Sequence, residues 1–167
     1  MTIIETTRAQ TSAVVPAPPR GRVIVGLRDM CEAAEALAVG FAEAARRGAE
    51  MVVTVVGDHA VGAGGDGLEP TFHPADERDV EAAGELAVAV AAARHTAPTV
   101  AVTTSLRTGC LAESLVELSR AADLLVLSAG RGPTGMGRSD LLVATHAECP
   151  VIVVRESTNR GGNRNSL

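Results

Sequence analysis

Five short runs of aliphatic residues recur along the chain, and none of them alternates between apolar and polar positions. Alternation marks a strand with one face in water, whereas continuous apolar runs of this length are typical of strands covered on both faces. The runs lie at 22–26, 51–56, 99–103, 123–127 and 150–154. The pattern therefore predicts five buried β-strands.

Longer segments rich in alanine separate these runs, and their apolar residues recur every three or four positions, as in an amphipathic helix. In the first segment the residues that share one face are Ala33, Leu37, Phe41, Ala44 and Gly48. Asp29 and Glu32 are spaced to close a capping box at the start of this helix. Gly48 suits its end, because helices commonly terminate at a glycine.

Three further helices are predicted between the later strands, over about 75–95, 109–121 and 139–147. The apolar stripe of the helix at 109–121 consists of Leu111, Leu115, Leu118 and Ala122. Strands that alternate with helices form parallel sheets through right-handed crossovers. We therefore expect a single α/β domain, an open parallel five-stranded sheet with helices on both faces.

The 167 residues suit one domain, which we place at 21–156. Thr, Ala and Pro dominate 1–20, and Asn, Arg, Gly and Ser dominate 157–167, so both ends are expected to be disordered tails. The loop at 57–74 contains five glycines and is long for an α/β connection. It is either functional or simply flexible.

Composition narrows the classes of partner. The net charge is −5 and the chain has no Trp or Tyr, so it offers neither the basic surface nor the stacking platform that nucleic acids need. No apolar run reaches the roughly 20 residues of a membrane-spanning helix. The three cysteines include no close pair, which fits a reducing compartment better than a disulfide framework. A cytoplasmic protein without nucleic-acid or membrane partners is expected.

Ligands of open α/β sheets bind beyond the carboxyl ends of the strands, so the loops after the first, second and fourth strands form the candidate site. Glycines in the loop at 128–139 let backbone approach a ligand, and the next helix presents free N–H groups to an anion. The candidate ligand-binding residues are Gly26, Arg28, Asp29, Val56, Ser128, Gly130, Arg131, Gly132, Gly135, Gly137, Arg138 and Ser139. Ser139 either caps that helix or offers its hydroxyl to a phosphate. A phosphate-type site and a merely flexible turn both remain open.

Other reactive residues form no catalytic set in the sequence. It contains neither the Gly-Lys-Ser/Thr of a Walker loop nor a Gly-x-Ser-x-Gly elbow. Cys110 is either an activated thiol or a small apolar residue at a helix start. His59 and His73 are too loosely spaced to predict a metal site. His146 is expected to pack or to cap a helix, and no catalytic or metal-binding residue is assigned.

Five segments, in their order and spacing, resemble the universal stress protein family over nearly all of 22–155. They are Arg22-Val-Ile-Val-Gly26, the stretches 44–50, 109–115 and 121–127, and His146-Ala-Glu-Cys-Pro-Val-Ile-Val-Val154. The last is the most specific, because the family's fifth strand typically follows a His-Ala-x-Cys-Pro-Val stretch. The resemblance implies strand order 3-2-1-4-5 in a Rossmann-like fold of the adenine nucleotide alpha hydrolase type.

The resemblance also implies a homodimer through the fifth strand, Val151–Val154, whose exposed edge can pair with a second copy. Many members bind ATP or AMP without strong catalytic activity. In those members the phosphates rest on Gly-x-x-Gly, nine residues, then Gly followed by Ser or Thr. An Asp just after the first strand holds the adenosine end.

The chain departs from that nucleotide pattern. Ser128 and Arg131 stand where the first two glycines are expected, and Arg138 follows Gly137 in place of Ser or Thr. Five residues separate Arg131 from Gly137 where nine are expected, so the loop is about four residues short. Side chains at positions of close approach should spoil the fit of the backbone around phosphates.

At the adenosine position stands Arg28, with Asp29 one residue late. Two functions remain open. The first is a non-catalytic, dimeric stress-response module with a degenerate nucleotide site. The second is an ATP- or AMP-binding stress protein that uses the remodelled loop, with at most slow ATP hydrolysis. An adenylating enzyme of the alpha hydrolase type would need a Ser-Gly-Gly-type loop after the first strand, which 27–29 does not supply.

Overall fold

The computed structural model describes residues 21–28, 30, 33–57, 77–129 and 137–155. Strands and helices alternate along this part of the chain. Their order is β1 (Arg22–Leu27), α1 (Ala33–Arg47), β2 (Glu50–Gly57), α2 (Glu77–Ala93), the 3₁₀ helix η2 (Arg94–Thr96), β3 (Val102–Thr108), α3 (Leu111–Ser119), β4 (Leu124–Ser128), α4 (Arg138–His146) and β5 (Val151–Val154). The predicted tails at 1–20 and 157–167, and the loop after Gly57, lie outside the described residues.

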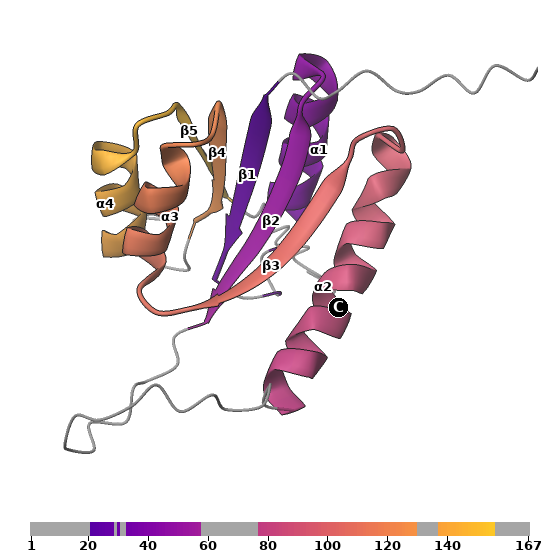
Figure 1. Ribbon diagram of the computed structural model, residues 1–167, viewed down its shortest axis with the longest axis horizontal. Coiled ribbons are helices and arrows are strands. Elements are labelled where there is room, and N and C mark those ends of the chain that lie inside the picture. Colours follow the sequence, from indigo (N-terminus) through magenta and orange to yellow (C-terminus); the bar gives the residue numbers. More distant parts are fainter. Residues whose placement is uncertain (1–20, 29, 31–32, 58–76, 130–136, 156–167) are drawn as a thin grey trace, which may run out of the picture.

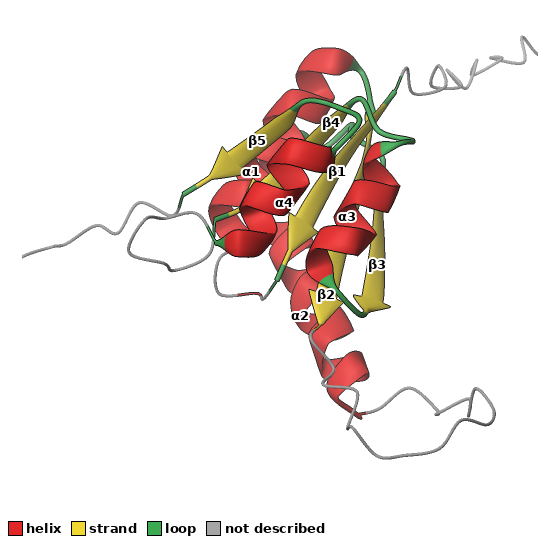
Figure 2. Cartoon of the chain, turned by 90° about the vertical axis from the view of Figure 1, so that its left-hand side faces the viewer, coloured by secondary structure: helices red, strands yellow, loops and turns green. Residues whose placement is uncertain are grey.

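All five strands run parallel in one sheet, in the order β3-β2-β1-β4-β5. Helices α1 and α2 cover one face of the sheet, and α3 and α4 cover the other (Figure 1, Figure 2). The chain runs outward from β1 to β3 and then returns to β4, so the strand order reverses between β1 and β4. The fold class and the strand order expected from the sequence are confirmed.

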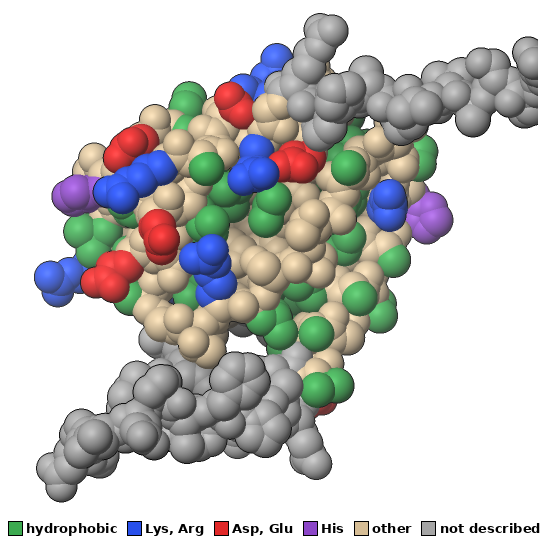
Figure 3. Space-filling view, in the orientation of Figure 1, with side chains coloured by type: hydrophobic (Ala, Val, Ile, Leu, Met, Phe, Trp, Pro, Cys, Tyr) green, Lys and Arg blue, Asp and Glu red, His purple; other side chains and the backbone are tan. Residues whose placement is uncertain are grey.

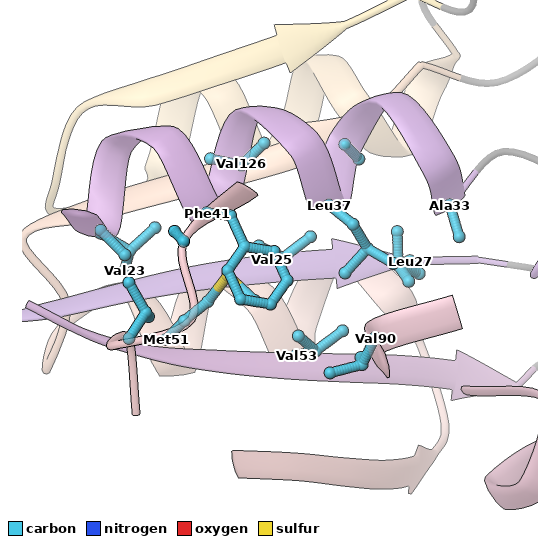
Figure 4. Packing of buried hydrophobic residues seen from close by; sticks show 14 of the residues in the cluster. Val23, Val25, Leu27, Ala33, Leu37, Phe41, Met51, Val53, Val90 and Val126 are labelled. Atoms are coloured by element: carbon cyan, nitrogen blue, oxygen red, sulfur yellow. The ribbon is translucent and has the colours of Figure 1, made fainter. Parts of the chain in front are cut away.

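The face under α1 and α2 holds the larger hydrophobic core. Phe41 of α1 is fully buried, and its ring lies against the sheet beside Val25 of β1 and Met51 of β2 (Figure 4). The helix face predicted from the spacing of apolar residues is buried at Ala33, Leu37, Phe41 and Ala44. Gly48 follows α1 with a φ of 62°, a left-handed conformation that favours glycine at a helix end.

At Gly40, α1 approaches β1 more closely than a side chain allows. A Cβ atom on Gly40 would overlap Cγ2 of Val25 and lie 3.1 Å from the sulfur of Met51. Val25 is fully buried and β-branched, so it has little freedom to move aside. Gly40 therefore sets the distance between α1 and the sheet, a role that the periodicity of the sequence did not indicate.

The smaller core lies under α3 and α4. Its buried members are Ile24, Leu125 and Leu127 from the strands and Ala112, Leu115 and Val143 from the helices. The stripe expected on the third helix is only partly right, because Leu111, Leu118 and Ala122 are half-buried. Ala122 lies beyond the end of α3. Ser119 takes a buried position instead, and its Oγ donates to the carbonyl of Val116 (2.6 Å).

The prediction for the third strand is wrong in its limits. β3 spans Val102–Thr108 rather than 99–103, and Thr99 lies in a turn where the N–H of Val100 donates to the carbonyl of Ala97 (3.2 Å). β3 is an outer strand of the sheet, so neighbours do not cover it on all sides. Its sequence can therefore be polar, and a search for continuous apolar runs does not find it.

The second, third and fourth helices differ from their predicted limits by one to two residues at each end. The capping box expected from Asp29 and Glu32 lies outside the described residues. The fourth helix begins one residue early, at Arg138, because Gly137 is its N-cap. Gly109 has a φ of 125° and stays outside α3, whose N-cap is Cys110. In the part of the chain that the structure describes, no helix has both the length and the apolar character needed to cross a membrane.

Candidate functional site

The carboxyl edge of the sheet brings together the end of β1 and the start of α4. β1 and β4 are paired neighbours, with Gly26 opposite Leu127 in the register. Arg28 directly follows β1, and the connection after β4 leads into α4 at Gly137. Residues that are far apart in the sequence therefore meet where the strand order reverses, the usual place for a ligand in this class of fold.

Asp140, in the first turn of α4, is the centre of this arrangement. Its side chain is 2% exposed, and its Oδ2 accepts a hydrogen bond from the N–H of Gly137 (2.8 Å). Its Oδ1 lies 3.7 Å from Nη2 of Arg28, whose side chain is 45% exposed. A cation from the end of β1 thus faces a buried carboxylate at the start of α4.

Two sources of positive potential converge on the Asp140 carboxylate. The free N–H groups of the first turn place partial positive charge at the amino end of α4, where a carboxylate is stabilised. Arg28 adds a full charge, but it is half-exposed and its contact is long. The ion pair with Arg28 therefore adds little to stability, since screened ion pairs contribute about 0–1 kcal/mol.

The family model for the universal stress protein family matches residues 19–155. The chain belongs to the universal stress protein family. The membership expected from the sequence is thereby confirmed, and the observed strand order is the one that the resemblance implied. A search of curated protein sequences finds no match.

Solved structures of universal stress proteins share the fold. One from Lactobacillus plantarum has a TM-score of 0.61 at 21% identity, over 83% of this chain and 100% of that one. A universal stress protein in complex with cAMP has a TM-score of 0.59 at 19% identity, over 82% and 98% of the two chains. One from Archaeoglobus fulgidus in complex with dAMP gives 0.57 at 18% identity, over 80% and 96%.

In this universal stress protein the structure places some of the candidate residues at the carboxyl edge. Arg28, Gly137 and Arg138 lie there, and Arg138 is exposed as the first residue of α4. The N-cap is Gly137, so of the two roles expected for Ser139 the helix cap is wrong, and contact with a phosphate stays a prediction. Candidates that lie outside the described residues are Asp29, Gly130, Arg131, Gly132 and Gly135.

Ser128, the last residue of β4, is 9% exposed. Its hydroxyl has no hydrogen-bond partner within the described part of the chain. A buried hydroxyl is usually satisfied, so this oxygen retains both a donor and an acceptor at the edge where a ligand would bind. Val56, near the end of β2, is 1% exposed and lies in register with Arg107 of β3.

Gly26 has a packing role that the sequence did not reveal. A Cβ atom there would lie 2.7 Å and 2.8 Å from the two terminal carbons of Leu115 in α3. Leu115 is fully buried, and Leu127 Cδ2 closes a third side at 3.2 Å. The glycine therefore lets α3 seat against β1, whatever its relation to a ligand.

Replacing Gly26 with alanine is expected to lower the free energy of unfolding by about 1–3 kcal/mol, the usual cost of overpacking. Gly84→Ala is the matched control, because Gly84 lies inside α2 with nothing within 4 Å of an added Cβ. That control should gain about 0.5–1 kcal/mol from helix propensity. Urea denaturation of both variants measures the difference; a Gly26→Ala variant as stable as Gly84→Ala contradicts the packing role.

Asp140 is the residue of this site that the sequence reading missed. The spacing of Gly137 and Asp140 matches the capping-box spacing of an N-cap and an acidic residue three positions later, which could have indicated it. Its contact with Arg28 depends on the pairing of β1 with β4, which no local pattern contains. The spacing of residues in the sequence therefore could not predict this ion pair.

The remaining reactive residues take no part in the contact between Arg28 and Asp140. Nδ1 of His146 is 2.9 Å from the carbonyl oxygen of Leu142, so His146 caps the end of α4 while staying exposed. Cys110 is exposed at the start of α3. Burial raises the pKa of the Cys149 thiol, and the negative charge of Asp123 adds to the rise. Cys149 thus stays protonated at neutral pH, which disfavours a nucleophilic role.

A groove of about 350 Å³ lies between α3 and α4. It is lined by Ala112, Glu113, Val116, Glu117, Arg120, Leu142 and His146. In the view of Figure 3 charged side chains gather over the half of the molecule that carries these two helices. None of the groove residues takes part in the Arg28–Asp140 contact, and the described residues contain no group of three or more potential metal ligands.

Proposed function

We propose that this protein is a non-catalytic, homodimeric regulatory module of the universal stress protein family that works in the cytoplasm without binding a nucleotide in the family's usual pose. The observation that carries the proposal is the contact between Arg28 and the buried carboxylate of Asp140. At the adenosine position, where the family pattern has an acid, this chain has a cation, Arg28, that already contacts Asp140. The odd number of cysteines supports a reducing compartment.

Arg28 lacks the chemistry that an adenosine needs from this position. A guanidinium carries only donors, so it cannot accept hydrogen bonds from the hydroxyls of a ribose. Its Nη2 lies 3.7 Å from Oδ1 of Asp140, so the side chain extends toward α4. Both the character and the placement of Arg28 therefore work against the nucleoside half of ATP or AMP.

The homodimer is supported by the exposure of β5. This strand is an outer edge of the sheet, and all four of its residues, Val151–Val154, are half-buried although all are β-branched and apolar. Among the described residues no further strand pairs with this outer edge, and such an edge is a template for another strand. A second copy of β5 would cover the apolar side chains and satisfy the free backbone groups at once.

A second function keeps a specific observation in its favour. Two universal stress proteins of the same fold are described in complex with cAMP and with dAMP. In this chain Arg138 is exposed at the start of α4, where its charge could meet a phosphate. On this alternative the chain binds ATP or AMP through the shortened loop with at most slow hydrolysis, and the cofactor is an adenine nucleotide.

Thermal unfolding with millimolar ATP, ADP, AMP and cAMP separates the two functions. We expect no change in the melting temperature with any of them. A ligand at about 100 times its dissociation constant adds about 2.7 kcal/mol to stability, which corresponds to a rise of roughly 5–10 °C. Such a rise overturns the proposal and establishes the nucleotide-binding alternative; Arg131→Ala then tests whether the loop holds the phosphates.

A further inference from the structure

Helix α2 has an apolar outer face that no element of the described chain covers. Its inner side packs through Leu86 and Val90, which are 1% and 8% exposed. On the outer side Val80 is 65% exposed and Val88 is 71% exposed. We call this outer side the α2 face, and its exposed members are Val80, Gly84, Ala87, Val88 and Ala91. Figure 3 shows hydrophobic side chains along the part of the molecule where α2 lies in Figure 1. Contiguous exposed apolar side chains of this kind mark interaction sites.

The shape of the α2 face is complementary to itself. Val80, Gly84 and Val88 follow one another at intervals of four residues, so they form one ridge along the helix. Gly84 leaves a gap in this ridge, because nothing lies within 4 Å of a Cβ added there. Glycine is the poorest helix former after proline, and packing within the described chain does not require it at this position. The gap between the two valines can receive a valine from a facing helix.

The charges beside the α2 face are separated along the helix. Glu81 and Glu85 lie in its first half and Arg94 directly follows its last residue, and all three side chains are exposed. Nη2 of Arg94 makes only a long hydrogen bond within its own chain, to the carbonyl of Val100 (3.5 Å). The rise along a helix from Glu81 to Arg94 is about 20 Å, so these two residues of one chain cannot pair with each other. In an antiparallel pair of such helices, Arg94 of each copy lies within about one turn of Glu81 of the other.

We propose that α2 packs against α2 of a second copy, antiparallel across a two-fold axis, with Val88 of each copy in the gap at Gly84 of the other. Both copies use the same face, as in other two-fold interfaces. Opposite charges meet at both ends of the contact, which favours this orientation over a parallel one. The charge pattern of α2 therefore selects a second copy of this chain as the partner.

This contact goes beyond the proposed function and differs from the proposed dimer. Helix α2 lies over β3, at the edge of the sheet opposite β5 (Figure 1). The two contacts use separate surfaces, so both can form at once. Each copy in a β5 dimer would still offer its α2 face, and a rise in concentration would link dimers into larger assemblies.

The contact should be weak, because each copy contributes a single helix. Its area falls below the roughly 1,200 Å² of a specific stable complex, so we expect a dissociation constant on the order of 0.1–1 mM. The contact is then dissociated at the micromolar concentrations used for denaturation, where substitutions on α2 affect only the folding of one copy.

Sedimentation equilibrium of the full chain from about 10 µM to about 1 mM tests the inference. The weight-average mass of the wild-type chain should rise about 1.5-fold or more over this range. Val88→Glu places a carboxylate against the facing helix and should weaken the association at least about tenfold. Ala42→Glu is the matched control, because it adds the same charge to an exposed position of α1, and it should associate like the wild-type chain. A constant mass in the wild-type chain, undiminished association of Val88→Glu, or an equal loss in Ala42→Glu overturns the inference.

An exchange of charges tests the antiparallel orientation. Glu81→Arg and Arg94→Glu should each weaken the association at least about threefold, because each puts like charges together at both ends of the contact. The double variant should restore the wild-type association. One single substitution raises the net charge and the other lowers it, so a loss in both cannot come from net charge. A double variant that associates no better than the two single variants overturns the inference.

The mass at the lowest concentration separates this inference from the proposed dimer. A chain that is monomeric at about 10 µM and gains mass with concentration, except in Val88→Glu, sinks the homodimer of the proposed function and supports the inference. A chain that is dimeric at about 10 µM and keeps that mass up to about 1 mM supports the dimer and sinks only the inference.

Discussion

Replacing Phe41 with alanine is expected to lower the free energy of unfolding by about 3–5 kcal/mol, the usual cost of removing a buried aromatic side chain. Phe41 is 0% exposed and lies in the centre of the core between α1 and the sheet (Figure 4). It is the one aromatic side chain in the described part of the chain, where the rest of the core is Val, Leu, Ile, Met and Ala. Because the neighbouring side chains are small, few of them are long enough to fill the cavity that the missing ring would leave.

Such a loss is large because a domain of this size is stable by only about 5–15 kcal/mol. Urea denaturation followed by circular dichroism measures it. Val88→Ala is the control, since Val88 is 71% exposed on α2 and its truncation should stay within about 0.5 kcal/mol. A Phe41→Ala variant that unfolds within about 1 kcal/mol of the wild-type chain would contradict the central place given to this ring.

Ile152→Lys is expected to convert the proposed dimer into a monomer. Ile152 lies in the middle of β5 on the face that carries α1, but α1 lies chiefly over β1 and β4, so Ile152 stays half-exposed. Pairing of two β5 edges would bury a lysine from each copy. An uncompensated buried charge costs about 3–5 kcal/mol, which weakens the dimer at least roughly 100-fold.

Sedimentation velocity at several concentrations reads this result directly. Leu106→Lys is the matched control, because Leu106 belongs to β3 at the opposite edge of the sheet, lies on the same face and is 38% exposed. We expect the control to stay dimeric. A dimer that survives Ile152→Lys but is lost in Leu106→Lys places the interface on β3 and contradicts the assignment to β5.

The sequence predicted four of the five strands within two residues because those strands carry continuous apolar runs. β1 and β4 lie in the middle of the sheet with helices on both faces, so nearly every position is buried. β3 was misplaced because it lies at an edge, where exposure permits Thr, Ser and Arg. A continuous apolar run marks a strand that neighbouring elements cover on both faces. Such runs therefore do not identify a strand whose coverage is incomplete.

For the site, too, the sequence predicted features set by the order of the chain but not contacts set by strand pairing. The position of Arg28 after the first strand followed from the chain order, and the structure places it at the carboxyl edge. Its engagement with Asp140 follows from strand pairing and could not be seen in the sequence. Gly26 was interpreted as a ligand-side glycine, but the space of its missing Cβ is taken by Leu115. A glycine near a ligand site can be required for packing rather than for ligand approach, and only the tertiary structure distinguishes the two roles.

We propose that the carboxyl edge is closed to nucleotides because Arg28 and the amino end of α4 already contact the carboxylate of Asp140. A crystal structure of the wild-type chain grown with millimolar AMP tests it most directly. We expect Arg28 to face Asp140, the N–H of Gly137 to donate to the same carboxylate, and no nucleotide to lie between β1 and α4. An AMP phosphate on the N–H of Gly137, with Asp140 displaced and the adenosine seated beside Arg28, would contradict it.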